Sequence, residues 1–193
     1  MVNKLSETET KIPDVELVRQ ARAGDTQAFD ELMKRYSESI YLLTYSIVRS
    51  QADASDLSQE TFIRAYRSLA RYDERFAFYT WLRKIAVNLC FNLLKRRRRF
   101  RFLPLPMSDD ERERPDIPDP RPGPPEESGL RLDLERALNK LPPEQRAVFV
   151  LRVNEDMSYN EISKTLGIPI GTVMSRLNRA RQRLRELLKE YLP

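Results

Sequence analysis

Residues 158–181 read SYNEISKTLGIPIGTVMSRLNRAR, and this stretch predicts how the second half of the chain folds. Ser158, with Glu161 three positions later, forms a capping box, in which each side chain satisfies a free backbone donor at a helix start. Gly167 supplies a left-handed helix end, and Pro169 prevents that helix from continuing. We therefore expect a short helix, a turn and a second helix that begins at about residue 170.

The second of these helices has two chemically different faces. Apolar residues at spacings of three to four bury one face; they are Val173, Leu177, Ala180, Leu184 and Leu188. The opposite face is polar and basic, and carries Thr172, Ser175, Asn178, Arg179 and Gln182, with Arg176 and Arg183 at its edge. This pattern favours a helix-turn-helix whose second helix enters the major groove of DNA. The alternative is a solvated helix whose terminal cations offset the helix dipole.

The rest of the chain is predicted to be helical as well. Both halves show apolar residues at helical spacing, and no stretch alternates apolar and polar residues as a strand does. Turn residues and prolines divide the expected helices, which span about 13–22, 26–49, 53–70, 76–98, 129–140, 143–154, 158–166 and 170–190. The expected fold class is all-α, with two small helical domains.

A segment rich in proline and acid separates the two halves. Eight of the thirteen prolines lie between Pro104 and Pro125. Proline fixes φ and removes backbone donors, so this segment is typical of an extended linker. Residues 101–129 carry a net charge of −4, whereas residues 1–100 carry +5 and residues 130–193 carry +4. We therefore place an N-terminal domain at 1–100, an acidic linker at 101–128 and a C-terminal domain at 129–193.

The composition excludes several kinds of catalytic and cofactor site. The chain has no His, so a His-dependent triad and a His-ligated metal are both excluded. Five glycines cannot form the common nucleotide-binding loops here, and one Cys cannot form an internal disulfide or a CxxC motif. We expect no cofactor, no metal, no small-molecule substrate and no catalysed reaction. Because no targeting signal or long apolar span is present, we expect a cytoplasmic protein.

The helix expected at 53–70 carries acids on a face away from its apolar stripe. Asp53, Asp56 and Glu60 share this face. Taken alone, these acids are explained by the helix dipole, because carboxylates stabilise the first turn of a helix.

Residues 72–81 read YDERFAFYTW and contain five aromatic residues. The helix that follows places Lys84, Asn88, Phe91, Asn92, Lys95 and Arg99 on one face. Aromatic rings beside cations suit single-stranded nucleic acid, because each stacked base contributes about 1–3 kcal/mol. Core packing is the alternative, and it fits Phe78 and Trp81 best. Tyr72, Phe76 and Tyr79 are the freer candidates for stacking.

The motifs LPPEQR at 141–146, SYNEIS at 158–163 and GTVMSRLNRAR at 171–181 resemble region four of bacterial sigma factors, particularly the extracytoplasmic-function (ECF) group. The resemblance implies that the second helix of the motif reads the minus-thirty-five promoter element, through Thr172, Met174, Ser175, Arg176, Asn178, Arg179 and Arg183. Ser163 stands where the motif usually has alanine, and we expect slightly looser packing there. Met174 stands where relatives often carry a basic residue, which is expected to alter base preference.

The N-terminal half resembles region two of the same family. Residues 53–62, DASDLSQETF, imply a helix that docks on the clamp coiled coil of RNA polymerase through Asp53, Asp56, Gln59 and Glu60. Residues 78–82 and 85–88, FYTWL and IAVN, imply recognition and melting of the minus-ten element, with Asn88 reading an unstacked non-template base. The implied DNA contacts are Tyr72, Phe76, Tyr79, Trp81, Lys84, Asn88, Asn92 and Lys95. The basic run at 95–99 would bind phosphates.

Together these resemblances cover about 14–99 and 130–190 and predict an ECF sigma factor. They imply binding to core RNA polymerase and to promoter DNA, both as duplex and as the single non-template strand. They also imply a role in an envelope or other stress response, and an anti-sigma factor, commonly one anchored in the membrane. One alternative is a stand-alone helix-turn-helix regulator with an N-terminal dimerisation or sensing domain. A nuclease is a weaker alternative, because only Asp53, Asp56 and Glu60 resemble a metal site.

Overall fold

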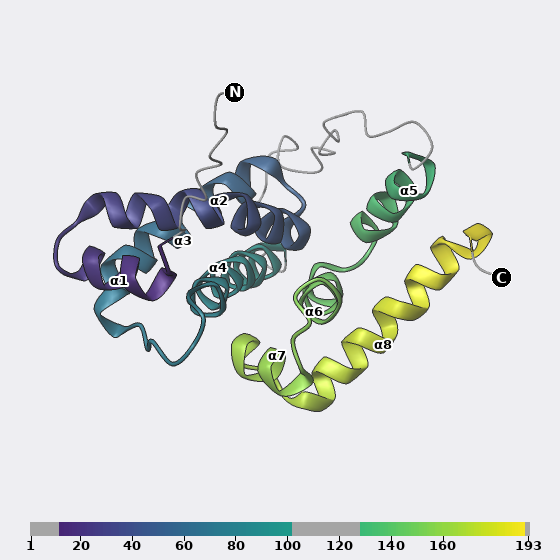
Figure 1. The fold of residues 1–193 in the computed structure, drawn as a ribbon. Helices are drawn as coiled ribbons and strands as arrows, with labels where there is room; N and C mark the ends of the chain where they lie inside the picture. The colour runs from purple at the N-terminus through teal and green to yellow at the C-terminus, as the bar shows by residue number, and fades with distance from the viewer. Residues whose placement is uncertain (1–11, 102–127, 192–193) are drawn as a thin grey trace, which may run out of the picture.

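The computed structural model describes residues 12–101 and 128–191 and shows two helical domains (Figure 1). The N-terminal domain contains α1 (Asp14–Arg22), α2 (Thr26–Val48), α3 (Gln51–Ser68), the 3-10 helix η1 (Leu69–Arg71) and α4 (Phe78–Arg101). The C-terminal domain contains α5 (Ser128–Asn139), α6 (Pro143–Val153), α7 (Tyr159–Leu166), α8 (Ile170–Leu187) and the 3-10 helix η3 (Lys189–Tyr191). Over these two ranges no strand occurs, so the predicted all-α class is confirmed. The acidic linker expected at 101–128 lies almost entirely outside the described residues.

Local capping explains where the helices begin. The Asp25 carboxylate accepts hydrogen bonds from the N–H groups of Gln27 and Ala28 and so starts α2. Ser50 caps α3 by accepting from the N–H of Asp53, so α3 begins two residues before the expected position. The start of α3 is therefore set by a serine cap that lies outside the ranges predicted to be helical.

The helix-turn-helix forms as its sequence predicts. Ser158 Oγ lies 3.2 Å from the N–H nitrogen of Glu161, and Glu161 Oε2 lies 2.8 Å from that of Ser158, which completes the capping box. Gly167 has a φ of 62°, a left-handed conformation that glycine adopts without steric cost, and it ends α7. Pro169 then precedes the first residue of α8.

An aromatic core holds the N-terminal domain together. Phe78 is 1% exposed, and its ring lies 5.6 Å from that of Tyr72 and 5.7 Å from that of Trp81. Tyr36 joins this group from α2, with its ring centroid 5.7 Å from that of Phe78. The start of α4 is therefore fixed by aromatic packing as well as by helical periodicity.

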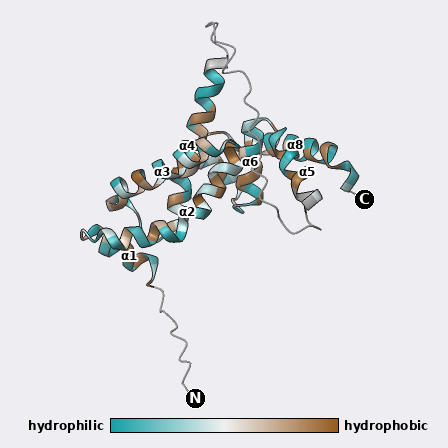
Figure 2. Cartoon of the chain, turned by 90° about the horizontal axis from the view of Figure 1, so that it is seen from above, coloured by the Kyte–Doolittle hydropathy of each residue, from teal (hydrophilic) through white to brown (hydrophobic). Residues whose placement is uncertain are grey.

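The two domains pack against each other. Helix α2 contacts α6, and α4 contacts both α6 and α7, so that α6 lies between α4 and α8 (Figure 1). Buried residues of both domains, such as Leu82 and Val148, belong to one contiguous apolar core. The C-terminal end of α4 extends beyond the other helices and is largely hydrophilic (Figure 2). None of the described helices combines the length and apolar character needed to cross a membrane.

Candidate nucleic-acid interface

One face of α4 presents amides and cations to solvent. Lys84, Asn88, Asn92 and Lys95 follow one another at spacings of three to four, so they share one side of the helix. All four are exposed, whereas the intervening Ala86, Val87, Leu89 and Cys90 are buried. The burial of one side therefore leaves a polar, basic stripe on the other.

Two aromatic residues predicted to be accessible are buried instead. Tyr72 is 4% exposed, and its hydroxyl donates a hydrogen bond to the Phe76 carbonyl. The expectation that Tyr72 is free to stack on a base is therefore wrong in this structure. Phe91 is 5% exposed, so its expected place on the polar face is also wrong. Lys95 covers its ring, with Nζ 4.8 Å from the ring centroid.

The other aromatic candidates differ in accessibility. Phe76 is 58% exposed and remains available for stacking. Trp81 is partly buried against Tyr72. Tyr79 is also partly buried, and its hydroxyl donates to the carboxylate of Glu155 at 3.0 Å. Burial, followed by the charge of Glu155, raises the pKa of Tyr79 well above its usual range, so this hydroxyl stays a donor.

The acidic face of α3 is partly neutralised by arginines. Asp56 and Gln59 are exposed. Glu60 pairs with Arg64 on the same helix at 2.6 Å, and Asp53 pairs with Arg97 of α4 at 2.8 Å. Asp53 thus links two helices of its own domain. Among the described residues, no group of three or more acidic or cysteine side chains is placed to hold a metal ion.

The outer face of α8 is open. Val173, Leu177, Ala180 and Leu184 are at most 6% exposed and fix the helix orientation. Of the residues predicted to contact DNA, Met174, Ser175, Asn178, Arg179 and Arg183 are exposed, and Thr172 and Arg176 are partly buried.

Ser163 tightens the turn of the motif, contrary to the expectation of looser packing. Its hydroxyl donates to the Ile168 carbonyl at 2.6 Å, while its own carbonyl accepts from the N–H of Ile168 at 3.2 Å. With alanine at this position, only the backbone hydrogen bond between the two residues would remain. The hydroxyl therefore adds a hydrogen bond across the turn that precedes α8.

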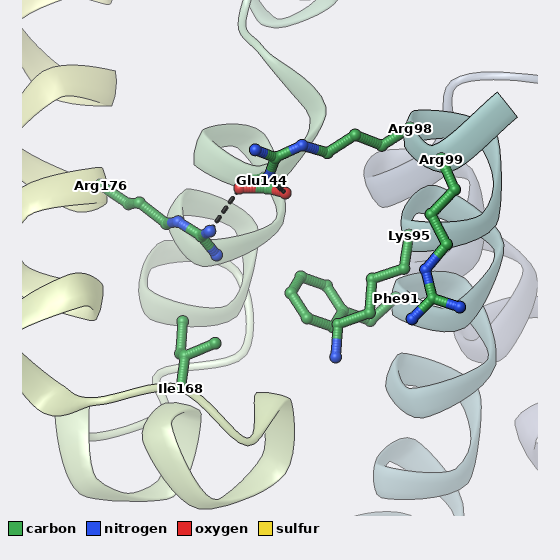
Figure 3. Close-up of a pocket in the computed structure, with 7 residues that line it drawn as sticks. All are labelled: Phe91, Lys95, Arg98, Arg99, Glu144, Ile168 and Arg176. Atoms are coloured by element: carbon green, nitrogen blue, oxygen red, sulfur yellow. Dashed lines mark hydrogen bonds and ion pairs between the residues drawn. The ribbon is translucent and has the colours of Figure 1, made fainter. Parts of the chain in front are cut away.

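A basic groove lies between α4 and α8 and has a volume of about 700 Å³ (Figure 3). Its lining residues are Phe91, Lys95, Arg98, Arg99, Glu144, Ile168 and Arg176. Glu144 accepts two charged hydrogen bonds, one from Arg98 at 2.7 Å and one from Arg176. The Nη1 atom of Arg176 is buried, and none of the residues that the structure describes forms a hydrogen bond with it. The groove thus combines four cationic side chains with one carboxylate, which contacts Arg98 and Arg176.

The sequence alone did not single out Arg83, Arg146 and Glu155 as interface residues. Arg83 contacts the Glu155 carboxylate at 3.3 Å, across 72 positions of sequence. Arg146 is 5% exposed, and desolvation lowers its pKa to about 10. The one available sequence signal was Arg146 itself, a charge that precedes the apolar run of residues 147–151.

Two family models match the chain. The model described as Sigma-70 region 2 matches residues 32–100, and the model described as Sigma-70, region 4 matches residues 131–184. These ranges fall in the N-terminal and C-terminal domains respectively.

Curated relatives extend this likeness over most of the chain. The RNA polymerase sigma-H factor of Pseudomonas aeruginosa is 35% identical over 95% of this chain and 97% of its own length. The ECF RNA polymerase sigma factor SigE of Mycolicibacterium smegmatis is 42% identical over 87% of this chain, and the match spans 65% of that relative.

A solved structure shares the fold. The sigma factor RpoE of Bartonella quintana, in complex with the anti-sigma factor NepR, is 25% identical, with a TM-score of 0.61. The match covers 85% of this chain and 98% of that one.

Proposed function

The chain belongs to the ECF sigma factors of RNA polymerase, which are transcription initiation factors. We propose that it uses three separate surfaces: one on α3 for core polymerase, one on α4 for the minus-ten element and one on α8 for the minus-thirty-five element. It binds core RNA polymerase and directs initiation at a particular set of promoters. The observation that supports two separate promoter contacts is that α4 and α8 of one chain each expose a polar and basic face.

The α4 face is the proposed site for the minus-ten element. Asn88 lies at its centre, and its amide both donates to and accepts from a base edge. Lys84, Asn92 and Lys95 flank it and attract the phosphates of the same strand. Phe76 offers an exposed ring beside this stripe for a stacked base.

The α8 face is the proposed site for the minus-thirty-five element. Its first turns carry Thr172 and Ser175, short polar side chains that reach base edges when the start of a recognition helix enters the major groove. Arg176 and Arg179 extend this face and are suited to bidentate pairing with guanine. Arg183, farther along, is placed for phosphate contact.

The remaining partners follow from α3 and from the relatives. Asp56, Gln59 and Glu60 form the proposed contact with core polymerase, whereas Asp53 contributes mainly through its pair with Arg97. The RpoE structure contains an anti-sigma factor, which supports regulation of this chain by a protein of that kind. We place the protein in the cytoplasm, where its polymerase partner acts.

Transcription by purified core enzyme tests the proposed function directly. Core RNA polymerase, with and without this protein, is supplied with genomic DNA, and the transcript starts are sequenced. We expect new starts that share two upstream sequence elements. If the added protein never redirects initiation, the sigma function is refuted and the stand-alone regulator becomes the better explanation.

Substitution of Asn88 tests the minus-ten surface. Asn88→Ala should lower open-complex formation on a duplex promoter about tenfold and relax the preference for one base, because a base-reading contact is worth about 1–3 kcal/mol. The readouts are transcript yield and binding to single-stranded oligonucleotides that differ at one base. Gln51→Ala, at an exposed position on α3, serves as the control. Unchanged base preference in Asn88→Ala would remove Asn88 from the reading site.

A further inference from the structure

Helix α1 contacts the loop of residues 72–77, which joins η1 to α4. The contact is centred on Arg22, the last residue of α1. Its Nε donates to the Leu69 carbonyl at 3.0 Å, its Nη2 donates to the Tyr72 carbonyl, and its Nη1 donates to the Glu74 carboxylate at 2.8 Å. One guanidinium therefore ties α1 to η1 and to the first half of the loop.

Glu74 also binds a second arginine of the same helix. Arg19 donates from Nε and Nη2 to one carboxylate oxygen of Glu74 at 3.1 and 2.8 Å, and Arg22 donates to the other oxygen. Ion pairs that are partly exposed, as these are, add little stability by themselves. The bonds from Arg22 to the two backbone carbonyls differ, because they fix the path of the main chain. The arginines of α1 thus restrain both the backbone and a side chain of the loop.

The loop in turn fixes the backbone of Phe76. Tyr72, whose carbonyl accepts from Arg22, donates from its own hydroxyl to the Phe76 carbonyl. The Phe76 N–H donates to the Asp73 carbonyl at 3.1 Å. Both backbone groups of Phe76 are therefore hydrogen-bonded, while its ring is exposed and lines a pocket of about 260 Å³ together with Lys84. The ring thus lies beside the polar, basic stripe of α4.

We propose that Arg22 and Glu74 are positioning residues, through which α1 holds the 72–77 loop in the conformation that presents Phe76 to a base of the minus-ten element. The inference rests on the proposed function, because it takes Phe76 as a contact for the single strand. It extends that function to a helix with no proposed DNA contact of its own. Helix α1 also ends before residue 32, where the match to Sigma-70 region 2 begins.

The physical reason is the cost of ordering a loop. A flexible loop loses backbone freedom when its ring stacks on a base, and this loss weakens binding. A loop that is already held by hydrogen bonds to α1 has lost that freedom before the strand arrives. Removal of Arg22 should therefore weaken only the contribution of the Phe76 ring, and leave the contacts of Lys84 and Asn88 unchanged.

Binding of single-stranded DNA to the full-length protein tests the proposal. The probe is a fluorescent random-sequence single-stranded 20-mer at low salt, because stacking on a ring tolerates any base. Phe76→Ala should bind it about tenfold more weakly, through the loss of one stacked base. Arg22→Ala should bind about threefold more weakly than Arg71→Ala, a control that removes an exposed cation from η1 beside the loop.

A double-mutant cycle separates positioning from a general loss of stability. In the Phe76→Ala chain, Arg22→Ala should weaken binding no more than Arg71→Ala does, because no ring is left to position. A loss that persists without the ring would overturn the positioning role, since it would mean that Arg22 contacts the DNA itself or supports the whole domain. If Phe76→Ala alone leaves the affinity unchanged, the ring is not a DNA contact, and both this proposal and that part of the proposed function are refuted.

Hydrogen exchange guards against a folding artefact. In Arg22→Ala, the backbone amides of residues 72–77 should exchange faster, whereas those of α2 and α8 should exchange as in the unmodified chain. Arg22→Lys keeps the charge but not the planar fork that reaches two carbonyls and a carboxylate, so it should behave as Arg22→Ala does. Unchanged exchange in the loop, or full affinity in Arg22→Lys, would refute the positioning role. The sigma function is scored separately, by the transcript starts made with core polymerase.

Discussion

Helix α8 and helix α4 carry similar polar stripes but sit in very different surroundings. Helices α5, α6 and α7 of the same domain pack against one face of α8, and its opposite face is exposed to solvent. By contrast, α4 packs against α2 and α3 on one side and against α6 and α7 on another. A helix that packs on one side only leaves its outer residues exposed. In a helix that also contacts the other domain, some of the outer residues form structural contacts instead.

The difference is clearest in the aromatic and charged residues of the N-terminal domain. Tyr72 and Phe91 are buried in its core, and Asp53 is paired with Arg97. Within the described part of the chain, Arg176 is the one predicted DNA contact of α8 that a carboxylate holds, because it lies at the edge of the apolar face. Large rings gain more from burial than short polar side chains do, so they are drawn into a core when one is near.

Among these predictions, substitution of Tyr72 should give the largest loss of stability. A small loss would contradict the difference in burial between Tyr72 and Phe76. Tyr72→Ala removes a buried ring that contacts Phe78 and Trp81, and should lower the free energy of unfolding by about 3–5 kcal/mol. Phe76→Ala, at a 58% exposed ring, should change it by less than about 0.5 kcal/mol. Urea denaturation followed by circular dichroism measures both. Equal effects would mean that the two rings do not differ in burial.

Substitution of Arg179 sharpens the comparison at the open face of α8. Arg179→Ala should weaken binding to the upstream promoter element by about 1–3 kcal/mol and spare binding to core polymerase. Arg185→Ala removes another exposed cation, from the last turn of the same helix, and is the matched control. Holoenzyme binding to duplex promoter DNA and core binding are measured side by side. A parallel loss of core and DNA binding would contradict the division of surfaces.

The capping box should give the smallest effect. Ser158→Ala should lower the free energy of unfolding by about 1 kcal/mol, with the exposed Ser37→Ala as the control. Hydrogen bonds from the Ser158 side chain and backbone hold the pKa of Glu161 below its ordinary value of 4.5. The folded form therefore binds a proton less readily than the unfolded form, and the stabilisation is complete above pH 4.5.

As the pH falls through the lowered pKa of Glu161, this stabilisation is lost. The difference in unfolding free energy between the unmodified chain and Glu161→Gln should accordingly shrink on acidification. Denaturation at neutral pH and at several acidic values measures this difference. A difference that stays constant would show that Glu161 does not act through its charged form.

Much of the C-terminal motif could be predicted, because its determinants lie within a few residues of one another. Ser158 and Glu161 are three positions apart, and Gly167 ends the helix that they begin. The apolar spacing of α8 likewise set which of its residues face solvent. The predicted start of α3 is two residues late, because the cap at Ser50 lets the helix begin at Gln51.

The sequence by itself thus determined the helices, the capping box of α7 and the two polar stripes, since these depend on contacts within three or four positions of the chain. Only the tertiary structure decided which of those polar residues form contacts with other parts of the protein. Arg146 meets Ile47 across 99 positions, and Tyr79 meets Glu155 across 76. Periodicity specifies that a helix face is buried, but the packing of distant segments decides what covers it, and with it which donors remain for DNA.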